Sequence, residues 1–221
     1  MRTALPALFP WGSRRRGEPE PATIAAPAIP ETTAASKVLP KFLAALSHYS
    51  SPALLDLGPV IGANVAFFGD RLACRIQVED LYADIEAQAR QDAADGLWQA
   101  ISKRLTPHAP ASFDGILCWD VFDYLDRATG QALAARLASL LRPGGVLYGF
   151  FGTTAVDLLH YTRFVVEDQN TFRQRSYPAT PVRRNVLVTR DITRMFDPLA
   201  VTESVLLKTS TRETLFRKPA G

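Results

Sequence analysis

Short apolar runs alternate with helical patterns through the middle of the chain, and this alternation restricts the fold more than any other feature. The apolar runs are residues 53–58, 73–80, 113–125 and 146–153. Strands that alternate with helices form βαβ units, whose strands lie parallel in one sheet covered by helices on both faces. We therefore predict an α/β fold with a mostly parallel sheet.

The segments between these runs have the spacing of amphipathic helices. In residues 36–51, for example, Leu39, Phe42, Leu43 and Leu46 recur at helical intervals. The other predicted helices are residues 63–72, most of 81–105, and 127–141. No strand is visible between residues 82 and 113.

The last third of the chain has a different pattern. Residues 162–168 and 185–189 are rich in β-branched residues and flank a polar loop that carries several arginines, and residues 190–196 read as a short helix. Residues 200–210 and 211–218 read as two strands with almost nothing between them. Such a close pair must be antiparallel, because a parallel return needs a crossover of about a dozen residues or more.

Residues 1–36 are rich in Pro and Ala and contain little that could form a core. We predict a disordered tail there and one domain over residues 37–221. The alternative is that Trp11, its apolar neighbours and Arg14–Arg16 form a short docking element.

Composition places the chain among ordinary globular proteins. The net charge of +3 is diffuse, so nothing points to nucleic acid, and no apolar run approaches the length that crosses a membrane. Cys74 and Cys118 fall on strands separated by a third strand, too far apart for a disulfide. The arginines of the N-terminus follow its apolar stretch instead of preceding it, unlike a secretion signal. We predict a cytoplasmic protein with reduced thiols; the oligomeric state is open.

Residues 54–62, LLDLGPVIG, join a strand to a helix through an acid and a glycine loop. Glycines let a ligand approach the backbone, and the helix N-terminus offers free N–H groups. Glu79 follows Gly58 by about 20 residues, the distance at which a carboxylate accepts hydrogen bonds from ribose hydroxyls. This pattern favours a nucleotide-like ligand.

These motifs, together with FDGILCWDVFDYLD and LLRPGGVLYGFF, resemble class I S-adenosylmethionine-dependent methyltransferases, in particular a bacterial methyltransferase-like branch. The resemblance covers residues 54–218 and implies a Rossmann-like sheet with an antiparallel C-terminal hairpin. It also implies S-adenosylmethionine as cofactor and a small molecule or protein as methyl acceptor. The implied cofactor-binding residues are Asp56, Gly58, Gly62, Glu79, Asp80, Cys118, Trp119 and Asp120, the first three at the methionine end.

His160 and Tyr161 are candidates for acceptor binding or catalysis, because the resemblance places them just beyond the fourth apolar run. No spacing typical of a metal site, a phosphate loop or a Ser-His-Asp arrangement is present. The glycine loop departs from the family pattern, since Val60 replaces its middle glycine and Pro59 precedes it. We expect the Val60 side chain to pack into the sheet; the alternative is that it points at the ligand.

Two other functions fit parts of the sequence. One is a non-catalytic binding or interaction module that keeps the methyltransferase fold. The other is a nicotinamide oxidoreductase, but Gly58, Val60 and Ala63 do not supply its glycine pattern. Binding of S-adenosylmethionine separates the first of these from an active enzyme.

Overall fold

The computed structural model describes residues 31–91 and 96–220, and it confirms the α/β fold. Its main sheet has six strands in the order β3-β2-β4-β5-β9-β8. The first four strands are parallel to one another, β9 runs antiparallel to β5, and β8 runs antiparallel to β9. The strands are β2 (Ala53–Asp56), β3 (Arg75–Val78), β4 (Phe113–Trp119), β5 (Leu141–Gly152), β8 (Ala200–Leu206) and β9 (Thr211–Arg217).

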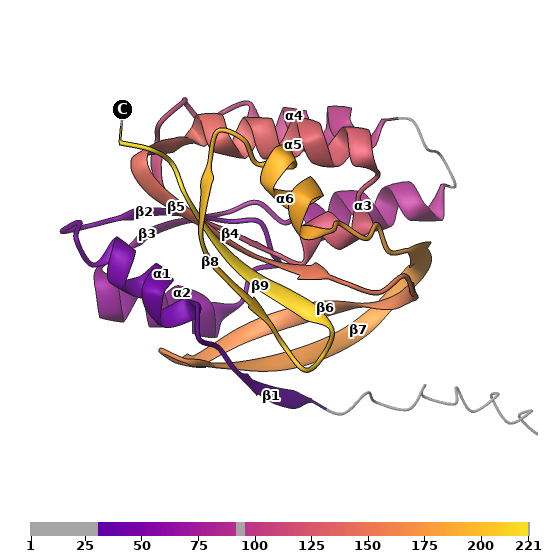
Figure 1. Cartoon of the computed structure of the whole chain (residues 1–221), viewed down its shortest axis with the longest axis horizontal. Helices are drawn as coiled ribbons and strands as arrows, with labels where there is room; N and C mark the ends of the chain where they lie inside the picture. Colours follow the sequence, from indigo (N-terminus) through magenta and orange to yellow (C-terminus); the bar gives the residue numbers. More distant parts are fainter. Residues whose placement is uncertain (1–30, 92–95, 221) are drawn as a thin grey trace, which may run out of the picture.

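Helices cover both faces of this sheet (Figure 1). One face carries α1 and α2, and the other carries α3, α4, α5 and α6, so that each face has its own apolar cluster. None of the helices in the described part is long and apolar enough to cross a bilayer. The helices are α1 (Leu39–Leu46), α2 (Gly62–Leu72), α3 (Leu81–Arg90), α4 (Leu97–Leu105), α5 (Arg127–Leu140) and α6 (Thr189–Met195), and a 3-10 turn, η1, spans Val121–Tyr124.

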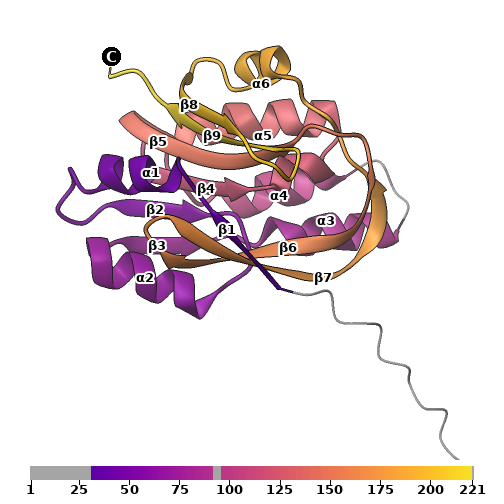
Figure 2. The same ribbon diagram turned by 60° about the horizontal axis from the view of Figure 1, so that its bottom comes forward.

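A second, antiparallel sheet with the strand order β1-β7-β6 lies against the first. It consists of β1 (Thr32–Ala35), β6 (Asp157–Asp168) and β7 (Thr171–Arg183). Figure 2 shows the β6–β7 hairpin passing from the side of α2 towards α3. Asn64 of α2 bonds to the main chain of β6, and Glu86 of α3 accepts hydrogen bonds from Thr180 of β7. The hairpin therefore spans the edge between these two helices.

This hairpin corrects two expectations. The expected arginine-bearing loop is strand β7, whose partner is β6. Residues 185–189, expected to be β-rich, form no strand; they lead irregularly into α6. Of these residues only Leu187 is buried, and Val188 is exposed, so the β-branched residues here have no sheet to pack against. As predicted, no strand lies between β3 and β4 in the described residues.

The expected boundary of the tail at residue 36 is wrong for its last residues, while residues 1–30 lie outside the described part. Thr32–Ala35 pair with β7, and Ser36 is buried.

Cys74 and Cys118 are free thiols, the first partly buried and the second fully buried. Cys74 directly precedes β3, and Cys118 lies in β4. Strand β2 lies between these two strands, as expected.

Ser36 links the start of the folded chain to the central sheet. Its hydroxyl donates to the buried carboxylate of Glu213 on β9 and accepts hydrogen bonds from the N–H groups of Val38 and Leu39 at 3.1 and 2.7 Å. The hydroxyl of Tyr148 on β5 donates to the same carboxylate. Glu213 is fully buried, so these two hydroxyls take the place of water at its Oε1.

Replacing Ser36 with Ala should therefore destabilise the fold by about 1–3 kcal/mol, the usual cost of leaving a buried polar group with a missing partner. The matched control is Ser47→Ala, because the exposed Ser47 hydroxyl only donates to the carbonyl of Ala44. Urea unfolding of both variants checks this, and equal losses in the two would contradict the role of Ser36.

Candidate active site

Three acids meet at the carboxyl edge of the main sheet, as predicted. Asp56 ends β2, Glu79 follows β3, and Asp120 follows β4. In the parallel register Asp56 pairs with Val78 on one side and with Leu117 on the other. The carboxyl ends of parallel strands are where open α/β sheets bind ligands.

Asp56 is nearly inaccessible to solvent, and its Oδ1 accepts two hydrogen bonds. The donors are the main-chain N–H of Gly58 at 2.8 Å and the indole Nε1 of Trp119 at 2.6 Å. Burial outweighs these donors and raises the pKa of Asp56 to about 6. The acid thus joins the glycine loop to the end of β4.

Glu79 is only half-buried and faces two basic side chains. His108 Nε2 lies 2.9 Å from its Oε1, and Arg104 Nη1 lies 3.9 Å from its Oε2. Arg104 is oriented by Asp84, to which it donates two hydrogen bonds of 2.7 and 3.0 Å. Asp80 has a local role, since it caps α3 by accepting from the main-chain N–H of Tyr82 and from that of the next residue.

A second group of polar side chains lies beyond β4, and the sequence indicated only part of it. The Tyr82 hydroxyl donates to Asp120, and Asp123 accepts from the main-chain N–H of Gly152 at 2.9 Å. Arg184 Nε lies 2.9 Å from Asp123. Burial raises the pKa of Asp120 to about 6 and that of Asp123 to about 7. Only the acids of residues 120–123 carried a signal in the sequence, because Tyr82 and Arg184 are brought there by folding.

Strand β6 crosses this edge and separates two cavities. Successive side chains of a strand point to opposite sides, so Tyr161 and Arg163 face one cavity while Thr162 and Phe164 face the other. The first has a volume of about 220 Å³, with Pro59, Asp80, Tyr82, Ala83, Glu86, Arg90, Tyr161, Arg163, Tyr177 and Pro178 in its wall. The second has a volume of about 90 Å³, with Asp120, Asp123, Phe150, Thr162, Phe164, Gln174, Arg184, Leu207, Thr209 and Thr211 in its wall.

Of the two candidate catalytic residues, only Tyr161 lines one of these two cavities. Its hydroxyl donates to Glu86 at 2.8 Å, and its ring packs at right angles to that of Tyr82. His160 lines neither cavity, and its main-chain oxygen accepts from the hydroxyl of Tyr124. The structure therefore separates two residues that the sequence could not distinguish.

Trp119 and Cys118 point to opposite faces of β4. Trp119 belongs to the apolar cluster on the side of α1 and α2, whereas Cys118 is buried in the cluster on the side of α5. Cys118 Sγ donates to the carbonyl of Tyr148 at 3.2 Å, and Cys118 lines neither cavity, so only Trp119 of this pair reaches the glycine loop.

Within the glycine loop, Gly58 approaches Trp119 closely, whereas Gly62 begins α2 with open space around it. Val60 is 73% exposed, so the expectation that it packs into the sheet is wrong. The side chain that packs beside Gly58 is the indole of Trp119. Among the described residues, no group of His, Cys, Asp and Glu could hold a metal ion.

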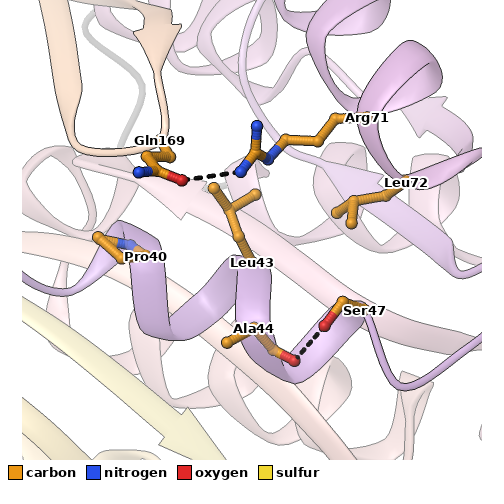
Figure 3. Close-up of a pocket in the computed structure, with 7 residues that line it drawn as sticks. All are labelled: Pro40, Leu43, Ala44, Ser47, Arg71, Leu72 and Gln169. Carbon is orange, nitrogen blue, oxygen red and sulfur yellow. Dashed lines mark hydrogen bonds between the residues drawn. The ribbon is translucent and has the colours of Figure 1, made fainter.

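A larger cavity, of about 490 Å³, lies apart from this edge, between α1, α2 and the turn after β6 (Figure 3). Arg71 spans it and donates to Gln169 at 2.8 Å. Arg71 is its only titratable lining side chain, so the chemistry concentrates at the carboxyl edge instead.

Part of the chain matches a known protein family. Residues 55–149, less than half of the chain, match the model of a methyltransferase domain family. This segment contains Asp56, the glycine loop, Glu79 and Asp120. A search of curated proteins gives no match.

Among solved structures, the chain is similar to an S-adenosylmethionine dependent methyltransferase from Mesorhizobium loti. The TM-score is 0.51 at 13% identity, over 81% of this chain and 96% of that one. It is also similar to the 1,6-didemethyltoxoflavin-N1-methyltransferase of Burkholderia thailandensis, with a TM-score of 0.49 at 15% identity over 83% and 79% of the two chains. At such identities the likeness concerns the fold.

The raised pKa of Asp56 predicts a pH-dependent stability that Asp56→Asn removes. The folded state holds the Asp56 proton more tightly than the unfolded chain, whose Asp pKa is about 3.9. Wild type should therefore lose stability as the pH rises from about 4 through about 6. Over that window its free energy of unfolding should fall by on the order of 3 kcal/mol relative to the variant, measured by urea unfolding.

The matched control is Asp126→Asn, at the N-cap of α5. Hydrogen bonds from Thr129 and Ala128 hold the pKa of Asp126 below its usual range, so here wild type should gain stability over its variant as the pH rises. A flat difference between wild type and Asp56→Asn from about pH 4 to pH 7 would contradict the assignment.

Proposed function

We propose that this chain is an S-adenosylmethionine-dependent methyltransferase that methylates an amine or hydroxyl of a small polar molecule beside Asp120. The match of residues 55–149 to a methyltransferase domain family and the similarity of the fold to such an enzyme support the cofactor. The observation that carries the proposal is the position of Asp120. This buried acid lines the polar cavity beyond β4 and accepts from Tyr82, which lines the cavity beside the glycine loop. Asp120 thus lies between the two cavities, in the wall of one and hydrogen-bonded to a residue in the wall of the other.

The residue types around the first cavity fit the cofactor. Pro59 belongs to the glycine loop and Asp80 follows the ribose acid Glu79, so this cavity suits the adenosine part. Glu79, the acid proposed for the ribose, lies next to this cavity in the chain, and its oxygens are at present near His108 and Arg104. Against Gly58, however, the methionine end has no space while Trp119 keeps its place. S-adenosylmethionine supplies a methyl group bonded to a positively charged sulfur.

The second cavity suits the reacting end of an acceptor. Its volume of about 90 Å³ admits a group of a few heavy atoms. Its wall offers the hydroxyls of Thr162, Thr209 and Thr211 and the guanidinium of Arg184. A small polar molecule can form hydrogen bonds with these groups, whereas a folded protein chain could not enter.

Asp120 is suited to accept the proton that an amine or hydroxyl loses when it is methylated. A general base works best when its pKa lies near the working pH, and burial raises the pKa of Asp120 to about 6. Above that pH the carboxylate is ionised and can take the proton on an Oδ atom. Tyr82 donates to the same carboxylate and so fixes its orientation.

The test is transfer of a labelled methyl group from S-adenosylmethionine in a cell extract separated into small molecules and macromolecules. We expect label in the small-molecule fraction, with the acceptor then identified by mass spectrometry. Label found only in protein or nucleic acid would refute the proposed acceptor class.

With an acceptor identified, the pH profile tests Asp120. The kcat/KM of wild type should fall below about pH 6, as Asp120 becomes protonated. Asp120→Asn should lose roughly 100-fold or more in kcat, in the range of general-base catalysis, and should lose that acidic limb. Asp157→Asn, at an exposed position of β6, is the control. An unchanged acidic limb in Asp120→Asn would mean that another group takes the proton.

A further inference from the structure

We propose that Trp119 is an internal plug that occupies the place of the cofactor's methionine end and must leave it before S-adenosylmethionine binds against Gly58. The inference rests on the cofactor of the proposed function, but on neither the acceptor nor the role of Asp120. It concerns a contact within the chain that closes the cofactor site.

The indole lies directly on the glycine loop. A Cβ atom placed on Gly58 would come within 2.7 Å of Trp119 Cδ1 and within 2.8 Å of Nε1. Real Cβ atoms essentially never approach other heavy atoms so closely, so no ligand atom fits between the two residues. Trp119 is only 3% exposed, which means that the space above it is closed as well.

Two partners hold the indole in this position. Its Nε1 donates to Asp56 at 2.6 Å, which satisfies the one polar atom of the buried ring. Phe164 of β6 stacks on the indole, with ring centroids 5.3 Å apart and an interplanar angle of 4°. Phe172 of β7 adds an edge contact with a centroid distance of 5.9 Å.

Strand β6 is itself fixed beside the glycine loop by Asn64, in the first turn of α2. The Asn64 amide donates to the carbonyl of Phe164 and accepts from the N–H of Val166, both at 2.8 Å. These contacts therefore connect the glycine loop, the Trp119 plug and the β6–β7 hairpin to one another. A movement of β6 away from α2 would release the stacked ring and the indole together.

The backbone favours release of the plug. Trp119 has a φ of 47°, in the left-handed region that bulky side chains rarely adopt. Strained residues of this kind persist only where their surroundings hold them, and they concentrate at functional sites. Departure of the indole would also remove one of the two hydrogen-bond donors to Asp56 Oδ1, which a ligand could then replace. The cavity beside Pro59 and Asp80 is open without this movement.

Calorimetric titration of the full chain with S-adenosylhomocysteine tests the plug. Trp119→Gly removes the indole and suits the left-handed backbone. It should bind roughly tenfold tighter or more than wild type, because the apparent dissociation constant varies inversely with the open fraction. Phe196→Ala, a buried aromatic position that packs on Phe216, controls for loosened packing and should bind like wild type.

A second variant covers the case in which Trp119→Gly fails to fold. Phe164→Leu keeps the indole and loses only the stacked ring, and it should bind about threefold tighter than wild type, since it raises the open fraction less. Binding by a folded variant without any measurable binding by wild type supports a tightly closed plug. The proposal is overturned if the folded variants bind S-adenosylhomocysteine no more tightly than wild type does. It is also overturned if neither wild type nor any folded variant binds it.

Fluorescence gives an independent readout of the indole. With Trp11 and Trp98 replaced by Phe, Trp119 is the only tryptophan left. Saturating S-adenosylhomocysteine should shift its emission to longer wavelengths as the ring leaves its buried stack. An unchanged emission under conditions where calorimetry shows binding overturns the proposal. Failure of methyl transfer with this shift intact would instead refute only the proposed acceptor.

Discussion

The contact between Trp119 and Gly58 organises the carboxyl edge of the sheet. It exists because β2 and β4 are parallel neighbours, so that the residue ending β4 lies beside the loop that follows β2. Only glycine lets a ring approach the backbone so closely. Asp56 accepts the hydrogen bond from the indole N–H, and the packed indole in turn helps to bury the Asp56 carboxyl group. Removing the contact would leave a buried carboxylate with one donor fewer.

The β6–β7 hairpin divides this edge of the sheet into two small cavities. It is fastened to α2 through Asn64 and to α3 through Glu86, whose pKa is lowered to about 2 although its burial acts the other way. Hydrogen bonds from Thr180, Tyr161 and Arg90 account for that shift. Because successive side chains of a strand point to opposite sides, β6 lines both the cavity proposed for the cofactor and the cavity proposed for the acceptor.

Several parts of this arrangement were predictable from sequence because they depend on local patterns. The helical spacing around Phe42 and the apolar run that ends at Asp56 specify their elements, and strand order places Glu79 on the same edge. Predictions about side-chain direction were less successful. Val60 was expected to pack into the sheet and is exposed, whereas the side chain that packs against the glycine loop is Trp119, from a distant part of the sequence.

The sequence by itself determined the α/β fold and the parallel direction of its strands. These two features place Asp56, Glu79 and Asp120 at the same edge of the sheet. These follow from periodicity and from the geometry of parallel strands, which act over short stretches of chain. Only the tertiary structure decided that β1 pairs with β7, that Ser36 bonds to Glu213, and that an indole covers the glycine loop. Such contacts join residues far apart in the chain, and packing of the whole molecule selects them.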